Sequence, residues 1–269
     1  MTRTIFHITL ILLITALAAF AQGNVDDVHL FQNFYRDATI ASSPYGEGFV
    51  NYSTYEYGSM FALGAQGGYG ITPQLEVNAN LGFTSFNPEY GDGSSGITDL
   101  TAAGRYLVLS QDALRITAGG FLTLPIGSED IGQGNLNFGA FGATRYGLSN
   151  GMVITGTVGL DFYETTTYEY EGGGVDFVDG DLVYTEPEEK TKTEYKNSLV
   201  LAGGVIYPQS DQLSIIGEIM FKTDQDYGML SGGVDYLLQN GGRVRGALGL
   251  GIDDAAPDFM ILLSYLMSF

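Results

Sequence analysis

Charged side chains recur inside segments of this sequence that otherwise alternate between apolar and polar residues. Such side chains can do two kinds of chemistry. They can line a passage and favour solutes of the opposite charge, or they can pair with one another, because buried charges must be paired. Twelve positions are candidates for such a polar lining: Glu76, Asp99, Arg105, Arg115, Arg145, Asp161, Glu218, Lys222, Asp235, Arg243, Arg245 and Asp253.

The segments that carry these residues have the period of two that is typical of β-strands. From Leu75 to Phe83 every second residue is apolar, and Glu76 lies on the opposite face. Each segment is about as long as the roughly 9–11 tilted residues that cross a bilayer, or longer. The pattern predicts twelve strands, over residues 46–56, 58–71, 75–86, 97–110, 114–126, 135–148, 152–165, 193–207, 212–222, 227–238, 243–253 and 258–269.

The connections between these segments alternate in length. Short polar turns fall at residues 72–74, 110–112, 149–151, 209–211 and 240–242. Longer links fall at residues 87–96, 127–134, 166–192, 223–226 and 254–257. Transmembrane barrels have tight turns on the periplasmic side and larger loops outside. An even number of strands then leaves both termini in the periplasm.

The apolar faces of the strands must meet either a protein core or lipid. Twelve strands enclose more space than side chains fill, since about eight strands already hold a small ligand. We therefore expect an all-β, antiparallel up-and-down transmembrane barrel, with lipid outside and the twelve charged positions facing the lumen. The five arginines among them would form a basic zone near the short turns. That zone either favours anionic solutes or belongs to a charge-paired network, and we favour the network.

Aromatic residues on the apolar faces agree with a membrane barrel. Rings at similar height near the short turns are typical of an interfacial girdle. Ordinary packing is the alternative, because aromatic residues also favour strands in general. The residues concerned are Tyr69, Tyr106, Tyr146, Tyr207, Tyr236 and Phe269.

The N-terminus has the pattern of a targeting segment. Arg3 precedes an apolar run over residues 8–19, and Ala19 and Ala21 provide small residues for cleavage before Gln22. This order predicts a cleaved secretory signal peptide at residues 1–21. A membrane anchor is the alternative, although the run is shorter than the ~20 residues of a spanning helix. We expect a periplasmic segment at residues 22–45 and the barrel at residues 46–269, in the bacterial outer membrane.

Residues 26–40 are the one stretch with helical spacing. Val28, Phe31, Tyr35 and Ala38 would share one stripe of a helix. The pattern predicts either a short helix that caps or plugs the periplasmic mouth of the barrel, or an extra strand.

Composition excludes several classes of function. The chain has 31 Asp and Glu against 11 Lys and Arg, a formal net charge of −20, which argues against nucleic acid as a partner. It has no Cys, and its two histidines, His7 and His29, precede every predicted strand. A hydrolase of the serine type generally needs a nearby base, most often His. We therefore expect no enzyme activity, no cofactor and no metal site.

Ten of the acids lie at residues 164–194, within and beside the longest link. Asp179, Gly180 and Asp181 sit between two short apolar runs, which predicts a β-hairpin outside the membrane. A specific cation site is disfavoured, because these three residues are not a calcium-loop pattern. The loop could instead make the protein a structural or adhesive barrel.

The last predicted strand alternates up to Phe269, the final residue. It resembles the terminal strand by which bacterial outer-membrane barrels are recognised by their assembly machinery. The resemblance implies two partners, the outer-membrane lipid and that machinery.

Three short elements are similar to a known family. They are YGIT at residues 69–72 running into LEV at residues 75–77, LPIG at residues 124–127 and RYGL at residues 145–148. The sequence resembles, over most of residues 58–269, the outer-membrane barrel family named after the phenol meta-cleavage pathway. That resemblance implies a passive channel or transporter for small, hydrophobic or aromatic compounds. It identifies neither a particular solute nor any binding residue.

Overall fold

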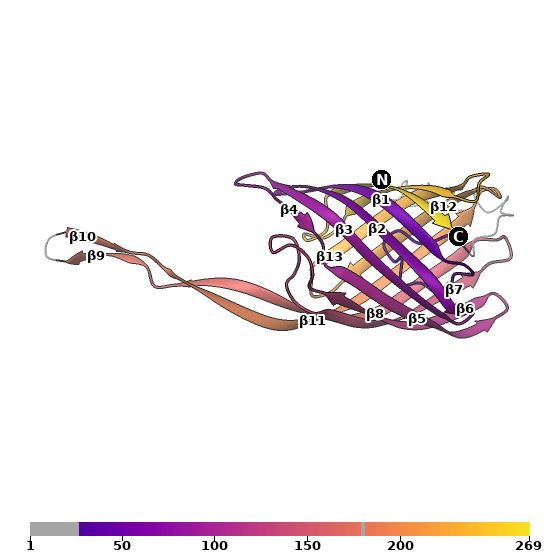
Figure 1. The fold of residues 1–269 in the computed structure, drawn as a ribbon, viewed down its shortest axis with the longest axis horizontal. Helices are drawn as coiled ribbons and strands as arrows, with labels where there is room; N and C mark the ends of the chain where they lie inside the picture. The colour runs from indigo at the N-terminus through magenta and orange to yellow at the C-terminus, as the bar shows by residue number, and fades with distance from the viewer. Residues whose placement is uncertain (1–26, 179–180) are drawn as a thin grey trace, which may run out of the picture.

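The computed structural model describes residues 27–178 and 181–269, and nearly every element in them is a strand of one closed barrel (Figure 1). Each barrel strand pairs antiparallel with its neighbour along the chain. The twelve strands are β1 (Tyr45–Tyr55), β2 (Gly58–Thr72), β3 (Leu75–Pro88), β5 (Leu100–Gln111), β6 (Leu114–Leu124), β7 (Asn137–Gly147), β8 (Val153–Glu171), β11 (Glu188–Pro208), β12 (Leu213–Lys222), β13 (Tyr227–Leu237), β14 (Arg243–Gly251) and β15 (Phe259–Ser268).

The barrel closes where its first strand meets its last. β1 pairs antiparallel with β15 from Tyr45 opposite Ser268 to Thr54 opposite Phe259. Closure leaves no edge strand with unpaired backbone groups, which a sheet in a bilayer requires. The predicted fold class, an antiparallel barrel of about twelve strands, is confirmed.

Two barrel strands run far beyond their neighbours. β8 and β11 have 19 and 21 residues and stay paired as far as Glu171 and Glu188. They leave the barrel as a two-stranded ribbon that ends in the hairpin of β9 (Gly174–Val178) and β10 (Asp181–Thr185) (Figure 1). The predicted hairpin is therefore present, although residues 179 and 180 lie outside the described part of the chain.

The link after β3 contains one more short strand, β4 (Ser94–Ile97). β4 pairs with the end of β3 at residues 83–86, whereas β5 pairs with β3 only at residues 75–80. The predicted strand at residues 97–110 therefore begins later than expected, and Asp99 lies between β4 and β5 rather than inside a strand. Its carboxylate instead accepts hydrogen bonds from the backbone N–H groups of Gly127 (2.9 Å) and Gln133 (2.7 Å).

The outer surface of the barrel is apolar. Leu248 and Leu263 are 54% and 61% exposed, whereas Arg245 on β14 is 1% exposed. Five of the six aromatic residues predicted for the girdle lie on the outer face. Tyr69, Tyr106, Tyr146, Tyr236 and Phe269 are exposed, but Tyr207 is buried.

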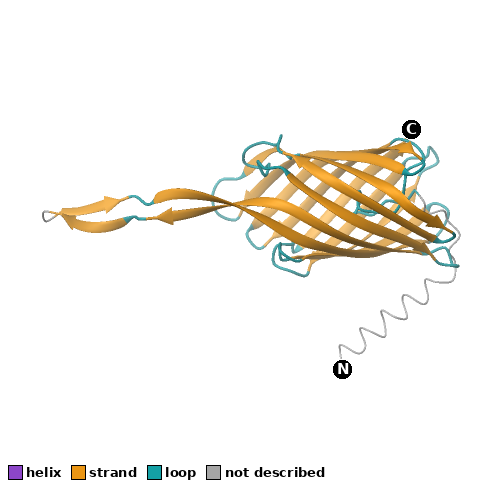
Figure 2. Cartoon of the chain, turned by 90° about the horizontal axis from the view of Figure 1, so that it is seen from below, coloured by secondary structure: helices purple, strands orange, loops and turns teal. Residues whose placement is uncertain are grey.

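The two ends of the barrel differ. We call the end with the turns after β2, β5, β7, β11 and β13 the short-turn end, and the end from which the β8–β11 ribbon projects the long-loop end (Figure 2). Phe269 is at the short-turn end, where its N–H donates to the Pro44 carbonyl (2.8 Å). Within residues 27–178 and 181–269, no helix is long and apolar enough to cross a membrane.

Candidate functional site

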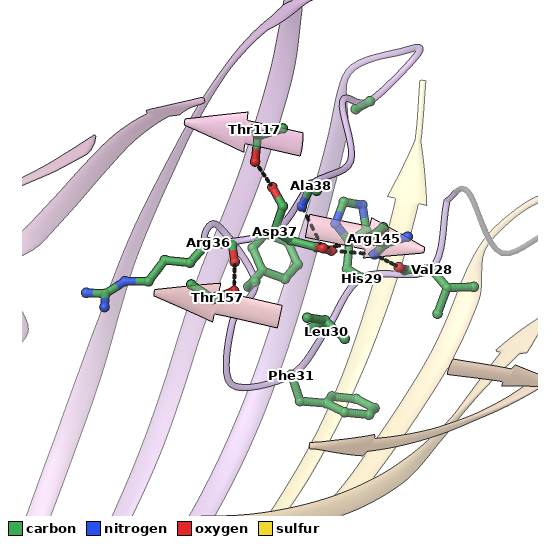
Figure 3. Close-up of polar contacts among 12 residues, drawn as sticks. Val28, His29, Leu30, Phe31, Arg36, Asp37, Ala38, Thr117, Arg145 and Thr157 are labelled. Atoms are coloured by element: carbon green, nitrogen blue, oxygen red, sulfur yellow. Dashed lines mark hydrogen bonds and ion pairs between the residues drawn. The ribbon is translucent and has the colours of Figure 1, made fainter. Parts of the chain in front are cut away.

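Residues 27–44 fold back into the barrel and form a plug inside its lumen (Figures 2 and 3). The segment plugs the barrel as one alternative predicted, but neither the predicted helix nor the predicted strand forms, because the plug consists of bends and turns. Val28, Leu30, Phe34 and Ala38 are at most 5% exposed. The backbone polar groups of such a segment need partners, and the partners come from the barrel wall.

One face of the plug is held by Arg145 on β7. Its Nε donates to Asp37 Oδ1 (2.8 Å), and its Nη2 donates to the Val28 carbonyl (2.6 Å) and to Asp37 Oδ2. Two threonine hydroxyls add support, since Thr117 donates to the Asp37 carbonyl (3.0 Å) and Thr157 to the Arg36 carbonyl (2.8 Å) (Figure 3). The guanidinium therefore neutralises a plug carboxylate and satisfies a plug carbonyl together.

Glu218 on β12 holds the next turn of the plug. Its carboxylate accepts the backbone N–H of Phe31 (2.7 Å) and of Gln32 (3.2 and 3.3 Å). The Gln32 amide then donates to the Ser231 hydroxyl on β13 (2.6 Å). Charge-assisted bonds of this kind are stronger than bonds between neutral groups, so this wall fixes the plug backbone directly.

The plug leaves the lumen beside Glu76 on β3. This carboxylate accepts from Arg105 Nη2 (2.6 Å), the Tyr45 hydroxyl (2.7 Å) and the Ala41 N–H (2.7 Å). Arg105 also donates through Nη1 to the Phe34 carbonyl (3.3 Å). Glu76 and Arg105 are both fully buried, and each satisfies part of the plug.

A further cluster of charges links β1 to β13 and β14. Asp235 accepts from Arg243 (2.6 Å) and from Arg245 Nε (3.0 Å), and Arg245 Nη1 pairs with Glu47 (2.6 Å). Arg245 Nη2 reaches the carbonyls of His29 and Leu30 in the plug. The arrangement that these residues make is the charge-paired network, and it is built around the plug.

The other predicted lining residues differ in their surroundings, and among these four only Asp253 lies outside a barrel strand. Arg115 is half-buried on β6, opposite Arg145 in the register. Asp253 is exposed in the turn after β14, because β14 ends at Gly251. Asp161 on β8 pairs with Arg36 of the plug (2.8 Å), and Lys222 lies at the end of β12.

Sequence reasoning missed three charged residues of the network. Glu47 could have been found, because it lies at the same spacing of two as Phe49 and Asn51 and so shares the inner face of β1 with them. Arg36 and Asp37 carried no usable signal, because a coil that lacks a period does not show which side chains face the wall.

A cavity of about 300 Å³ lies between the plug and the long-loop end. Its floor is made by the plug residues Phe31, Gln32, Tyr35 and Arg36. Its wall includes Met220, Lys222, Tyr227, Met229 and Met260. A second cavity of about 360 Å³ lies between the β2–β3 wall and the β6–β7 loop, beside Asp99. The plug thus occupies the lumen near the short turns, and the first cavity lies above it.

No protein-family model and no curated protein matches this chain in sequence. Three of the solved structures that are similar in fold are outer-membrane proteins of the following kinds. An outer-membrane channel from Pseudomonas putida F1 is 13% identical over 87% of this chain and 98% of its own, with a TM-score of 0.59. The NanC porin is 8% identical over 84% and 99%, with a TM-score of 0.51. The KdgM porin in complex with disordered oligogalacturonate is 11% identical over 83% and 99%, with a TM-score of 0.50. This chain therefore has the fold of outer-membrane channels and porins.

Proposed function

We propose that the protein is a bacterial outer-membrane channel that passes small compounds without an energy source, and that the plug at residues 27–44 is its gate. The observation that carries the proposal is a coil held inside an ionic lumen below a cavity of about 300 Å³. An apolar exterior with a polar, charged interior is the pattern of a barrel that offers solutes a wet path through lipid.

The way in which the plug is attached supports a movable gate. Its polar contacts with the wall are mostly side-chain hydrogen bonds and ion pairs, such as Arg145 with Asp37 and Glu218 with the Phe31 N–H. Its apolar side chains pack on the wall without joining the sheet. A plug that had joined the sheet as a thirteenth strand would have to break a whole ladder of backbone bonds. A coil bound by side chains can leave when water replaces those partners.

The sequence supports more specific proposals for the solute, the export and the orientation of the barrel. The resemblance to the phenol meta-pathway family favours a hydrophobic or aromatic solute. The segment at residues 1–21, which lies outside the described residues, would direct export and be cleaved. The short-turn end would face the periplasm, and β15 with Phe269 would be the strand that the assembly machinery recognises.

A catalytic role is not proposed. The one histidine within the described residues, His29, stacks on Phe34 (4.9 Å between ring centroids) and lies 4.5 Å from the Tyr45 ring. It is 4% exposed and lies inside the network of arginines. A base in that place reaches no solute.

Reconstitution in planar bilayers tests the channel. We expect rare, small openings from the chain without residues 1–21, because the plug occupies the lumen. Deletion of residues 27–41 removes most of the plug, leaves residues 42–44 before β1, and should give a larger and steadier conductance. Liposome swelling in a small neutral sugar should rise in parallel. Two sealed barrels, with and without the plug, would overturn the proposal.

The long ribbon favours a second candidate, a structural or adhesive barrel. β8 and β11 carry it well beyond the barrel, which a simple pore does not need (Figure 1). Deletion of residues 171–190 separates the two functions. Lost cell-surface binding with unchanged conductance favours adhesion, whereas changed conductance with unchanged binding favours transport.

A further inference from the structure

The cavity above the plug has cationic groups from both the plug and the wall. Arg36 comes from the plug and Lys222 from the end of β12, and both line the cavity. The Arg36 guanidinium lies 4.7 Å from the centroid of the Phe121 ring, and Lys222 Nζ lies 5.3 Å from that of Tyr227. Aromatic faces of this kind attract cations and hold them in place.

The arginine is buried and only partly satisfied. Arg36 is 5% exposed, its Nη2 donates to Asp161 (2.8 Å), and its Nη1 has no hydrogen-bond partner. A buried polar group without a partner is uncommon and calls for an explanation. Gln32 Oε1, also on the cavity floor, lacks a partner as well.

The lysine adds positive charge that no nearby acid neutralises. Within the described residues Lys222 forms no ion pair, and Asp161 pairs with Arg36. Arg36 and Lys222 thus share the single carboxylate of Asp161. A site with surplus positive charge in a lumen favours an anion.

The rest of the cavity is apolar and adaptable. Met220, Met229 and Met260 line it, with Tyr35 and Tyr227 beside them. Methionine is unbranched and polarizable, so it fits irregular apolar bodies and contacts aromatic rings favourably. The volume of about 300 Å³ is at the small end of ligand pockets, which suits a single ring or a short chain.

We propose that this cavity is a binding site for a small amphipathic carboxylate, with its anionic end at Arg36 and Lys222 and its apolar body among the three methionines. The inference rests on the proposed function, and it names the class of compound that the channel receives. Because Arg36 belongs to the plug and Lys222 to the wall, the carboxylate would contact both the gate and the barrel.

Binding of benzoate to the full barrel in a non-ionic detergent tests the site, with benzamide as the neutral probe of the same shape. Isothermal titration should show saturable binding of benzoate and at least about tenfold weaker binding of benzamide, since a charge-assisted bond is lost. The Lys222→Gln variant should lose about tenfold in benzoate affinity. Lys190→Gln, on the exposed ribbon, is the matched control and should bind as the wild type does.

Several results would overturn the site: no saturable binding of benzoate, equal binding of benzoate and benzamide, or unchanged affinity in Lys222→Gln. An equal loss in Lys190→Gln would do the same, because it would show a response to net charge alone. The swelling assay with a neutral sugar distinguishes this failure from failure of the channel. Sugar flux through the barrel without residues 27–41, together with no benzoate binding to the full barrel, overturns the site and leaves the channel. Benzoate binding to the full barrel with no flux through the barrel without residues 27–41 supports the site and overturns the channel.

Discussion

Arg145 of β7 and Asp37 of the plug form a buried ion pair that joins the barrel wall to the segment inside it. Arg145 Nε lies 2.8 Å from Asp37 Oδ1, and the two residues are 3% and 1% exposed. They are 108 positions apart in the sequence. Removal of one partner from a buried pair leaves the other charge without compensation, which costs about 3–5 kcal/mol. The position of the plug therefore depends on this pair.

Asp37→Asn should release the plug. The amide keeps the size of the side chain but removes the negative charge beside Arg145, so the plug should leave the lumen more often. We expect longer openings in planar bilayers and faster proteolysis at residues 27–44. Asp254→Asn, in an exposed turn, is the control and should behave as the wild type. Unchanged openings and unchanged proteolysis in Asp37→Asn would show that the pair does not hold the gate.

Glu76 and Arg105 should be energetically coupled. Both side chains are fully buried, and Arg105 Nη2 lies 2.6 Å from Glu76 Oε1. Glu76→Gln and Arg105→Met should each lower the free energy of unfolding by about 3–5 kcal/mol, because each leaves a buried charge. The double variant should lose less than the sum, by about 0.5–3 kcal/mol. Urea unfolding in vesicles, followed by the mobility shift of folded barrels in cold SDS gels, measures all three. Strictly additive losses would contradict the coupling.

A charge on the outer face should be costly at mid-height and tolerated near the end. Val158 lies midway along the barrel part of β8 and is 53% exposed, and Ile71 is 50% exposed at the end of β2. Val158→Arg should lower the free energy of unfolding by about 2–4 kcal/mol, and Ile71→Arg by about 0–1 kcal/mol. The same urea assay measures both. Equal effects would mean that this surface does not face hydrocarbon.

Acid should loosen the plug through His29, which lies outside the spanning strands. Burial holds the pKa of His29 well below 6.5, and the charges of Arg105, Arg245, Arg145 and Arg243 lower it further. Below pH 6.5 the unfolded segment therefore binds a proton that the folded plug does not. The contribution of neutral His29 to the stability of the folded plug is complete above pH 6.5. It falls as the pH drops below that value, by at most about 1.4 kcal/mol per pH unit.

His29→Phe should remove this dependence, because phenylalanine keeps the stacking on Phe34 and Tyr45 without a titrating group. Conductance of the wild type should rise between pH 7 and pH 5, while that of His29→Phe should stay level. A parallel rise in both proteins would assign the effect to other groups.

The strands could be predicted from the sequence because their cause is local. One face of each strand is apolar and the other polar, so a period of two marks both the strand and the face on which each side chain lies. The segment predicted at residues 75–86 is observed as β3, Leu75–Pro88. The same parity places Arg245 inside and Leu248 outside. Parity fails where a strand stops, and Asp99 and Asp253 lie beyond such ends.

The plug was decided by the tertiary structure alone. Its shape depends on wall side chains that come from distant strands, such as Arg145 at Asp37 and Glu218 at Phe31, 187 positions away. No residue within 27–44 encodes those partners, and the helical spacing of Val28, Phe31, Tyr35 and Ala38 led to the wrong element. The local tendency of this segment to form a helix is overridden here, because its buried backbone groups need hydrogen-bond partners and the surrounding wall supplies them. The sequence determined a barrel with an ionic interior, and the closure of that barrel around residues 27–44 decided what the charges hold.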